Sequence, residues 1–307
     1  MVRIFVPLAV GLLAALVVGP AARADFPRTI TDALGRAVTI PRKPTRIVSI
    51  FASNTEMLAA IGVRDRIVGI EAYTRFPPGI ERLPKIGGRL GFSVEAIARV
   101  SPDLVVMTPA RQAVSTLLKP MQTIGVPVVV LMHRDIEQVF GNIRLLGIAT
   151  GEDGKAEELI RKSRERIADV RRRLEGRLPR RVYLEVNAVA RGGFMTVRPG
   201  SYTADALRLA GGDNVFGTTP GQQIGGEAVL AADPDAILLA SRGVKPADLV
   251  RRVGWEHLNA VRSGAVHAVP RTLLLIPGPR IVDGVEALAK ILHPEAFTQP
   301  AAKSPRS

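Results

Sequence analysis

Arginine recurs in the loops of this 307-residue chain in a pattern that suits the binding of an anion. Six arginines stand in or near segments that follow short apolar runs: Arg75, Arg89, Arg111, Arg191, Arg242 and Arg271. A guanidinium group pairs bidentately with carboxylate-like oxygens, so such a set favours an anionic ligand. The chain holds 42 lysines and arginines, and several of the six are therefore expected to be ordinary surface residues.

Aromatic and histidine side chains stand in the same loops. Tyr73, Phe194 and Tyr202 offer flat apolar contact to a ligand, with core packing or loop anchoring as the alternative for each. His133 offers an axial ligand if the bound molecule is haem, although a single His at a strand end is more often a hydrogen-bonded loop residue. The other histidines lack the spacing of metal ligands, so no bare metal site is predicted.

One phrase occurs twice in the chain. The stretch "VEAIARVSPDLVVM" begins at Val94, and "GEAVLAADPDAILL" begins at Gly226. Each places a glutamate, Glu95 or Glu227, in the first turn of a short helix that leads into an apolar strand. The helix dipole stabilises a carboxylate there by about 0.3–1 kcal/mol, so neither Glu needs a partner. Their equivalent positions indicate two similarly built halves.

Short Val/Ile/Leu runs alternate with helical stretches along most of the chain, which predicts an α/β architecture with parallel sheets. Ser53 or Asn54 is predicted to cap a helix after the run "IVSI", and Asp135 to cap another that ends near Gly151. From Asp153 to Arg177 the chain runs without a breaker after Gly154, which predicts a helix of roughly 36 Å. Ligands of open α/β sheets bind beyond the carboxyl ends of the strands. The arginine, aromatic and histidine residues named above stand in loops at these ends.

The predicted organisation has five parts. They are a signal peptide (1–24), an N-terminal α/β lobe (25–152), an inter-lobe backbone helix (153–178), a C-terminal α/β lobe (179–294) and a disordered tail (295–307). The first segment has a basic Arg3, an apolar stretch too short for a comfortable membrane span, and a small-x-small site before Asp25. An uncleaved membrane anchor is the alternative for this segment.

Composition excludes several kinds of protein. The chain has no cysteine, which removes disulfides, thiolate-held clusters and a lipid-modified cysteine after the signal. The formal net charge is +14, but an exported protein whose basic segments lack interleaved aromatics is not predicted to bind nucleic acid. No P-loop, nucleophile elbow or HExxH motif is present, so no enzyme activity and no cofactor are predicted.

The order of these motifs resembles one family. "TDALGRAVTIPRKPTRIVSI", "NTEMLAAIGVRDRIVGI", "SVEAIARVSPDLVVM" and "GGEAVLAADPDAILLA", with the long middle helix, are similar to the periplasmic binding proteins for ferric siderophores, haem and cobalamin. The resemblance implies two Rossmann-like lobes joined by a single long backbone helix, with the ligand in a shallow cleft between them. It further implies that Glu95 and Glu227 form salt bridges with arginines of an ATP-binding-cassette (ABC) importer's permease.

The expected function is therefore capture of a small molecule for import. An iron(III) siderophore or related metal chelate is the first expectation; cobalamin or another corrinoid, haem or an oxyanion are alternatives. The expected partner is a permease dimer with its ATPase subunits, and a sensor or receptor in its place is an alternative that the two glutamates would also serve. The protein is expected to be a free periplasmic monomer without a membrane anchor.

Overall fold

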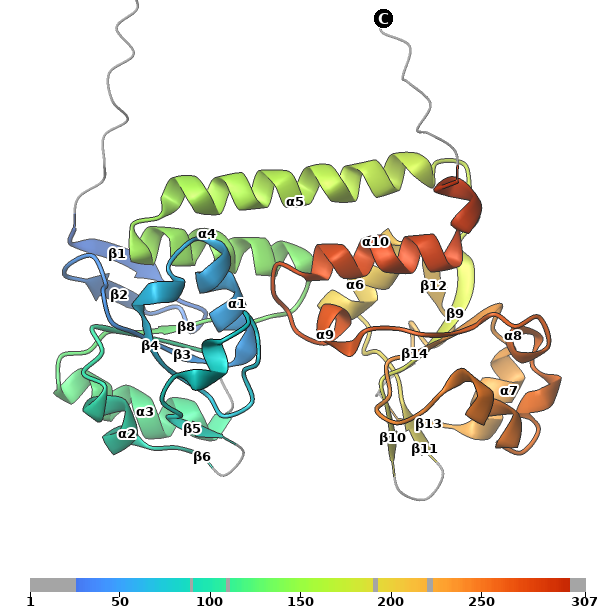
Figure 1. The fold of residues 1–307 in the computed structure, drawn as a ribbon, viewed down its shortest axis with the longest axis horizontal. Helices are drawn as coiled ribbons and strands as arrows, with labels where there is room; N and C mark the ends of the chain where they lie inside the picture. The colour runs from blue at the N-terminus through green and yellow to red at the C-terminus, as the bar shows by residue number, and fades with distance from the viewer. Residues whose placement is uncertain (1–25, 89–90, 109–110, 190–192, 220–222, 299–307) are drawn as a thin grey trace, which may run out of the picture.

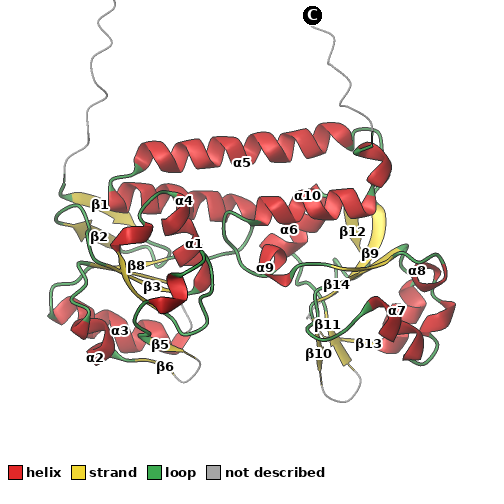
Figure 2. Cartoon of the chain, viewed as in Figure 1, coloured by secondary structure: helices red, strands yellow, loops and turns green. Residues whose placement is uncertain are grey.

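The computed structural model describes most of the chain in detail. The described residues are 26–88, 91–108, 111–189, 193–219 and 223–298; the side chains of 111–115 are not among them. The predicted signal peptide and most of the predicted tail therefore lie outside the described residues. Figure 1 shows two lobes beneath one long helix, and Figure 2 shows that each lobe mixes helices and strands.

The N-terminal lobe is built on a four-stranded parallel sheet of order β4-β3-β7-β8. The strands are β3 (Ile47–Ile50), β4 (Ile67–Ile70), β7 (Leu104–Met107) and β8 (Val128–Val130). All four residues of β3 and β7 are buried, as expected for strands covered by helices on both faces. The helices are α1 (Ala52–Ala60), α2 (Val94–Arg99), α3 (Arg111–Thr123) and α4 (Ile136–Thr150). Two antiparallel pairs complete the lobe, β1 (Arg28–Thr31) with β2 (Ala37–Ile40) and β5 (Gly87–Gly88) with β6 (Gly91–Phe92).

The C-terminal lobe repeats this plan with a parallel sheet of order β12-β9-β14-β15. Its strands are β9 (Arg180–Glu185), β12 (Gly212–Asn214), β14 (Ala236–Leu239) and β15 (Val266–Ala268). A small antiparallel sheet adds β10 (Asn187–Val189), β11 (Gly193–Met195) and β13 (Gln223–Gly225). The helices are α6 (Tyr202–Leu209), α7 (Gly226–Ala232), α8 (Asn259–Arg262), α9 (Arg271–Leu274) and α10 (Ile281–Leu292).

The long helix α5 (Asp153–Arg173) spans both lobes. It begins at the predicted residue and ends four residues before the predicted Arg177, with three arginines in its last turn. Its solvated face carries ion pairs, in which Arg161 contacts Glu158 at 2.8 Å and Glu165 at 2.6 Å. Such pairs stabilise a helix that stands partly in solvent.

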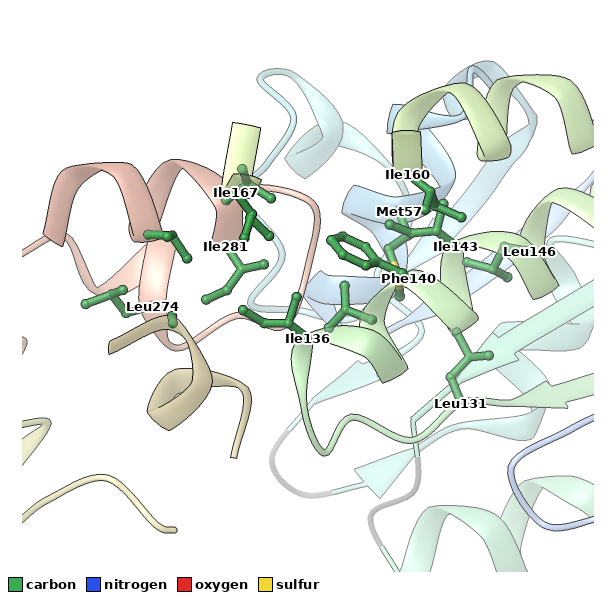
Figure 3. Close-up of a cluster of buried hydrophobic side chains, with 14 of the residues drawn as sticks. Met57, Leu131, Ile136, Phe140, Ile143, Leu146, Ile160, Ile167, Leu274 and Ile281 are labelled. Atoms are coloured by element: carbon green, nitrogen blue, oxygen red, sulfur yellow. The ribbon is translucent and has the colours of Figure 1, made fainter. Parts of the chain in front are cut away.

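The two lobes share one apolar core beneath α5. Helix α4 of the N-terminal lobe and α10 of the C-terminal lobe both pack on α5. Figure 3 shows Ile136 and Phe140 of α4, Ile167 of α5 and Ile281 of α10 gathered in one cluster. Separating the lobes on this side would expose buried apolar area, at about 25 cal/mol per Å². The lobes are therefore held together by packing as well as by the helix that connects them.

Two helix starts show how local chemistry sets an element's bounds. Asp135 caps α4 as predicted, its side chain accepting from the Gln138 N–H, and Gly151 ends the helix with φ 70°. The predicted cap of α1 is wrong: the helix begins at Ala52 after Phe51, whose φ is 86°. Ser53 and Asn54 lie inside the first turn. Their side chains instead form hydrogen bonds at the ends of neighbouring strands, Ser53 with His133 and Asn54 with the Ile50 carbonyl.

Candidate ligand cleft and docking surface

The carboxyl ends of the N-terminal strands carry a cluster of hydrogen-bonded polar side chains. Asn54, fully buried, donates to the Ile50 carbonyl at 2.6 Å and accepts from the Thr108 hydroxyl at 3.2 Å. These residues follow β3 and β7, and His133 follows β8, so the parallel sheet brings the three segments to one edge. This edge is where an open α/β sheet binds its ligand.

His133 is held at this edge by both of its ring nitrogens. Asn142 Nδ2 lies 3.1 Å from Nδ1, so Nδ1 accepts a hydrogen bond and the neutral tautomer carries its proton on Nε2. Nε2 lies 3.0 Å from the Thr108 hydroxyl and 3.3 Å from the Ser53 hydroxyl. Burial lowers the pKa of His133 to about 4. The imidazole is thus neutral at pH 7, and axial ligation of a haem iron requires Nε2 to give up these hydrogen bonds.

The buried His133 makes the protein's stability depend on pH. The unfolded imidazole takes up a proton near pH 6.5, whereas the folded one stays neutral until about pH 4. The unfolded state therefore binds more protons in this window, and the free energy of unfolding falls as the pH falls through it. Between pH 7 and pH 5 the expected loss is about 2 kcal/mol from this group.

Urea unfolding at the two pH values tests this expectation. His133→Gln should lose that part of the pH dependence, while His257→Gln, which changes an exposed side chain, should keep it. An equal loss of stability in the parent and in His133→Gln would contradict the assignment.

The carboxyl ends of the C-terminal strands are tied together by Arg271. Its guanidinium donates to the carbonyls of Val186, just after β9, and of Ala240, just after β14, the latter at 2.6 Å. Tyr202 similarly donates its hydroxyl to the Leu275 carbonyl at 3.1 Å. Burial raises the pKa of Tyr202 and lowers that of Arg271. Both predicted ligand contacts therefore also anchor loops of their own lobe.

A buried ion pair, absent from the sequence predictions, lies at the same edge. Glu185, the last residue of β9, is fully buried and receives two hydrogen bonds from Arg252, at 2.6 Å and 3.0 Å. The Arg252 guanidinium lies 4.2 Å from the ring centre of Phe194 and 4.5 Å from that of Trp255. Phe194 thus uses a ring face on Arg252 and packs against Trp255, with ring centres 5.2 Å apart. In the sequence, the indication of this pair is Glu185 itself, an acidic residue that follows the apolar run "VYL".

Of the other residues predicted to contact the ligand, the structure describes the surroundings of some and not of others. Tyr73 follows β4 and is 55% exposed. Arg75, in the same loop, donates to the carbonyls of Ala72 and Thr74 at 2.8 Å and 3.0 Å. Arg242 follows β14 and is exposed. Arg89 and Arg191 lie outside the described residues, as does the side chain of Arg111, the first residue of α3.

Two contacts bring the strand-end segments of the lobes together. The Ile136 N–H, at the start of α4, lies 3.3 Å from Asp205 Oδ2 on α6. Glu56 on α1 forms an ion pair with Arg280, the residue before α10. The segments that follow β3 and β8 therefore meet the second lobe directly.

Glu95 and Glu227 occupy matching places on the two lobes. Each is exposed in the first turn of its short helix, α2 or α7. Hydrogen bonds from its own backbone N–H and from Ser93 hold the pKa of Glu95 below its usual value. Figure 1 shows α2 and α7 at the far side of their lobes from α5. The two carboxylates thus belong to the part of the molecule that faces away from the long helix.

The family model for periplasmic binding proteins matches residues 47–272. The chain belongs to this family. The match begins at β3 and ends in α9, so it includes both parallel sheets and the helix that joins the lobes.

Individual relatives agree with this assignment. The chain is 29% identical to the "Uncharacterized ABC transporter substrate-binding lipoprotein YvrC" of Bacillus subtilis, with 89% of this chain and 88% of that protein covered. It is 24% identical to the "Vitamin B12-binding protein" of Vibrio cholerae, with 82% and 90% covered. A periplasmic haem-binding protein from Pseudomonas aeruginosa has a similar structure, with a TM-score of 0.69, 26% identity and 85% and 96% of the two chains covered. The α/β fold with two lobes and one long helix, predicted from the sequence, is confirmed.

The described residues contain neither a candidate membrane span nor a candidate metal site. Across residues 26–298 and outside their gaps, no helix is long and apolar enough to cross a membrane. Within the same part of the chain, no group of three His, Cys, Asp or Glu side chains is arranged to hold a metal ion.

Proposed function

We propose that this protein captures a metal chelate at the strand ends between its two lobes and delivers it to an ABC importer. The observation that carries the proposal is the pair of facing lobes, each with loops at the carboxyl end of a parallel sheet and each with an exposed glutamate on a short helix. The relatives support it, since the Bacillus subtilis protein is described as an ABC transporter substrate-binding lipoprotein.

A corrinoid is the first ligand candidate. The Vibrio cholerae relative is a vitamin B12-binding protein and is covered over 90% of its length. The arginines add less support for an anionic chelate than the sequence indicated, because Arg75 and Arg271 already donate to carbonyls of their own lobe. A ferric siderophore is the second candidate, since Arg242 is exposed just after β14.

Docking is assigned to Glu95 and Glu227. Two separated carboxylates on different lobes fix the orientation of the protein on a permease dimer, which a single charge would not. We further propose that the protein acts as a periplasmic monomer after removal of residues 1–24. The printed chain contains no cysteine, so a lipid anchor of the kind named for the Bacillus subtilis relative has no attachment site in it.

A thermal-shift screen of residues 25–307 tests the ligand class. The panel holds cyanocobalamin, cobinamide, ferric hydroxamate, ferric catecholate, ferric citrate, haemin and molybdate. A ligand at a hundredfold its Kd adds about 2.7 kcal/mol, which raises the melting temperature by a few degrees for a chain of this size. A shift with the two corrinoids alone is the expected result. A shift with a ferric chelate alone would replace the corrinoid proposal by the siderophore one, and silence across the panel would contradict both.

A further inference from the structure

The inter-lobe contact between Glu56 and Arg280 is built differently from the apolar core beneath α5. Glu56 lies on α1 of the N-terminal lobe and is 2% exposed. Arg280 Nε donates to Glu56 Oε2 at 3.0 Å, and its Nη2 donates to Oε1. The guanidinium also lies 3.8 Å from the ring centre of Phe76, which belongs to the N-terminal lobe. One side chain of the second lobe is therefore held by two groups of the first.

The contact is close on the side of Gly278. A Cβ added at Gly278 would come within 2.8 Å of Glu56 Oε2 and 3.3 Å of Glu56 Cβ, so a larger residue there would require the Glu56 side chain to shift. Ile281, the next residue after Arg280, is fully buried in the shared core. The ion pair therefore lies directly beside the first turn of α10, which packs in the shared core.

On its other side the contact borders an open space. A cavity of about 320 Å³ is lined by Glu56, Phe76 and Arg280, by Arg64, and by the small or ring-shaped side chains of Ala59, Ala60, Pro77 and Pro279. These residues come from both lobes. The space leaves room for the lobes to rotate slightly around the ion pair without a clash, which a filled interface would not allow.

Both partners are one short segment away from the strand ends that face the ligand. Three residues before Glu56 on α1, Ser53 contacts His133 at the edge of the N-terminal sheet. Before Arg280, the chain leads back to Arg271, which bonds the carbonyls at the edge of the C-terminal sheet. The ion pair is therefore connected along the chain to both edges.

We propose that the Glu56–Arg280 pair, covered by Phe76, is the pivot on which the two lobes close, and that it sets the rate of ligand release without touching the ligand. Glu56, Arg280 and Phe76 are positioning residues in this account. The part that concerns release rests on the proposed function; the part that concerns the lobe angle does not.

Distance measurement between the lobes tests the pivot in the ligand-free protein. Because the chain has no cysteine, Lys119→Cys on α3 and Arg262→Cys on α8, both at exposed positions, allow two spin labels to be attached selectively. In Glu56→Gln and Arg280→Lys the distribution of inter-label distances should broaden by about twofold, as expected when a lobe equilibrium is no longer held in one state. Glu158→Gln, which removes a carboxylate from an ion pair within α5 alone, is the matched control and should leave it unchanged.

A second readout separates this inference from the proposed function. Cyanocobalamin, preloaded on the protein, should dissociate about tenfold faster from Glu56→Gln than from the parent or from Glu158→Gln. If cyanocobalamin does not bind, the proposed ligand is wrong but the label distances still test the pivot. Phe76→Leu keeps the ion pair and loses the ring face, so it carries the test if the charge variants fail to fold. Unchanged distance distributions in variants that fold would overturn the proposal. An unchanged dissociation rate from a variant whose inter-label distances are more broadly distributed would overturn it as well.

Discussion

Replacing both Glu95 and Glu227 with alanine is expected to abolish the stimulation of the partner importer's ATPase while the affinity for ligand stays within about twofold, since both side chains are exposed on helices away from the inter-lobe contacts. Each single variant should retain partial stimulation, because one lobe can still dock. The measurement is ATP hydrolysis by the importer in proteoliposomes, with the substrate-binding protein added on the periplasmic side.

The control for this experiment removes the same charge elsewhere. Glu81→Ala with Asp213→Ala takes one exposed carboxylate from each lobe and should leave stimulation intact. Full stimulation by the Glu95 and Glu227 double variant would remove the docking assignment. An equal loss in both double variants would show that net charge matters and that these two positions do not.

The largest expected effect on stability comes from Arg252→Ala. This change leaves the Glu185 carboxylate fully buried without its cation. Breaking a buried pair by removing one partner costs about 3–5 kcal/mol, because the remaining charge is uncompensated. The guanidinium also lies over two adjacent aromatic rings, so its loss leaves space next to Phe194 and Trp255. The free energy of unfolding, measured in urea, should fall by this amount.

Two further variants distinguish the causes. Glu185→Gln with Arg252→Met removes both charges and keeps similar volumes, so it should cost much less than Arg252→Ala alone. Glu158→Ala breaks an exposed pair on α5 and should change stability very little, because solvent screens such a pair. A loss for Arg252→Ala as small as that for Glu158→Ala would contradict the buried-pair account.

The elements could be predicted because their determinants are local. Apolar runs such as "IVSI" and "LVVM" became fully buried parallel strands, and Asp135 and Gly151 mark the two ends of α4. The start of α1 could not be predicted from the sequence in the same way, because it depends on the backbone conformation of one residue. Phe51 adopts a positive φ, which few residues other than glycine favour, and it therefore moved the start of α1.

The site was less predictable because its contacts join residues far apart in the chain. Glu185 and Arg252 are 67 positions apart, and Glu56 and Arg280 are 224 apart. Sequence spacing indicates neither pair, since only the packing of the lobes brings the partners together. The same packing directs Arg271 to backbone carbonyls, which a list of loop arginines does not reveal. The sequence thus identified the edges where the ligand is proposed to bind but not the roles of the side chains there.

Hydrogen–deuterium exchange with and without the chelate that gives the largest thermal shift tests the central claim most directly. If the ligand is held between the lobes, amides that follow the strands of both parallel sheets should exchange more slowly when it is bound, around Tyr73 and His133 in one lobe and around Val186 and Arg242 in the other. The amides of α2 and α7 should be unaffected, because the account leaves them free for the permease. Protection confined to a single lobe, or centred on α5, would contradict binding between the lobes.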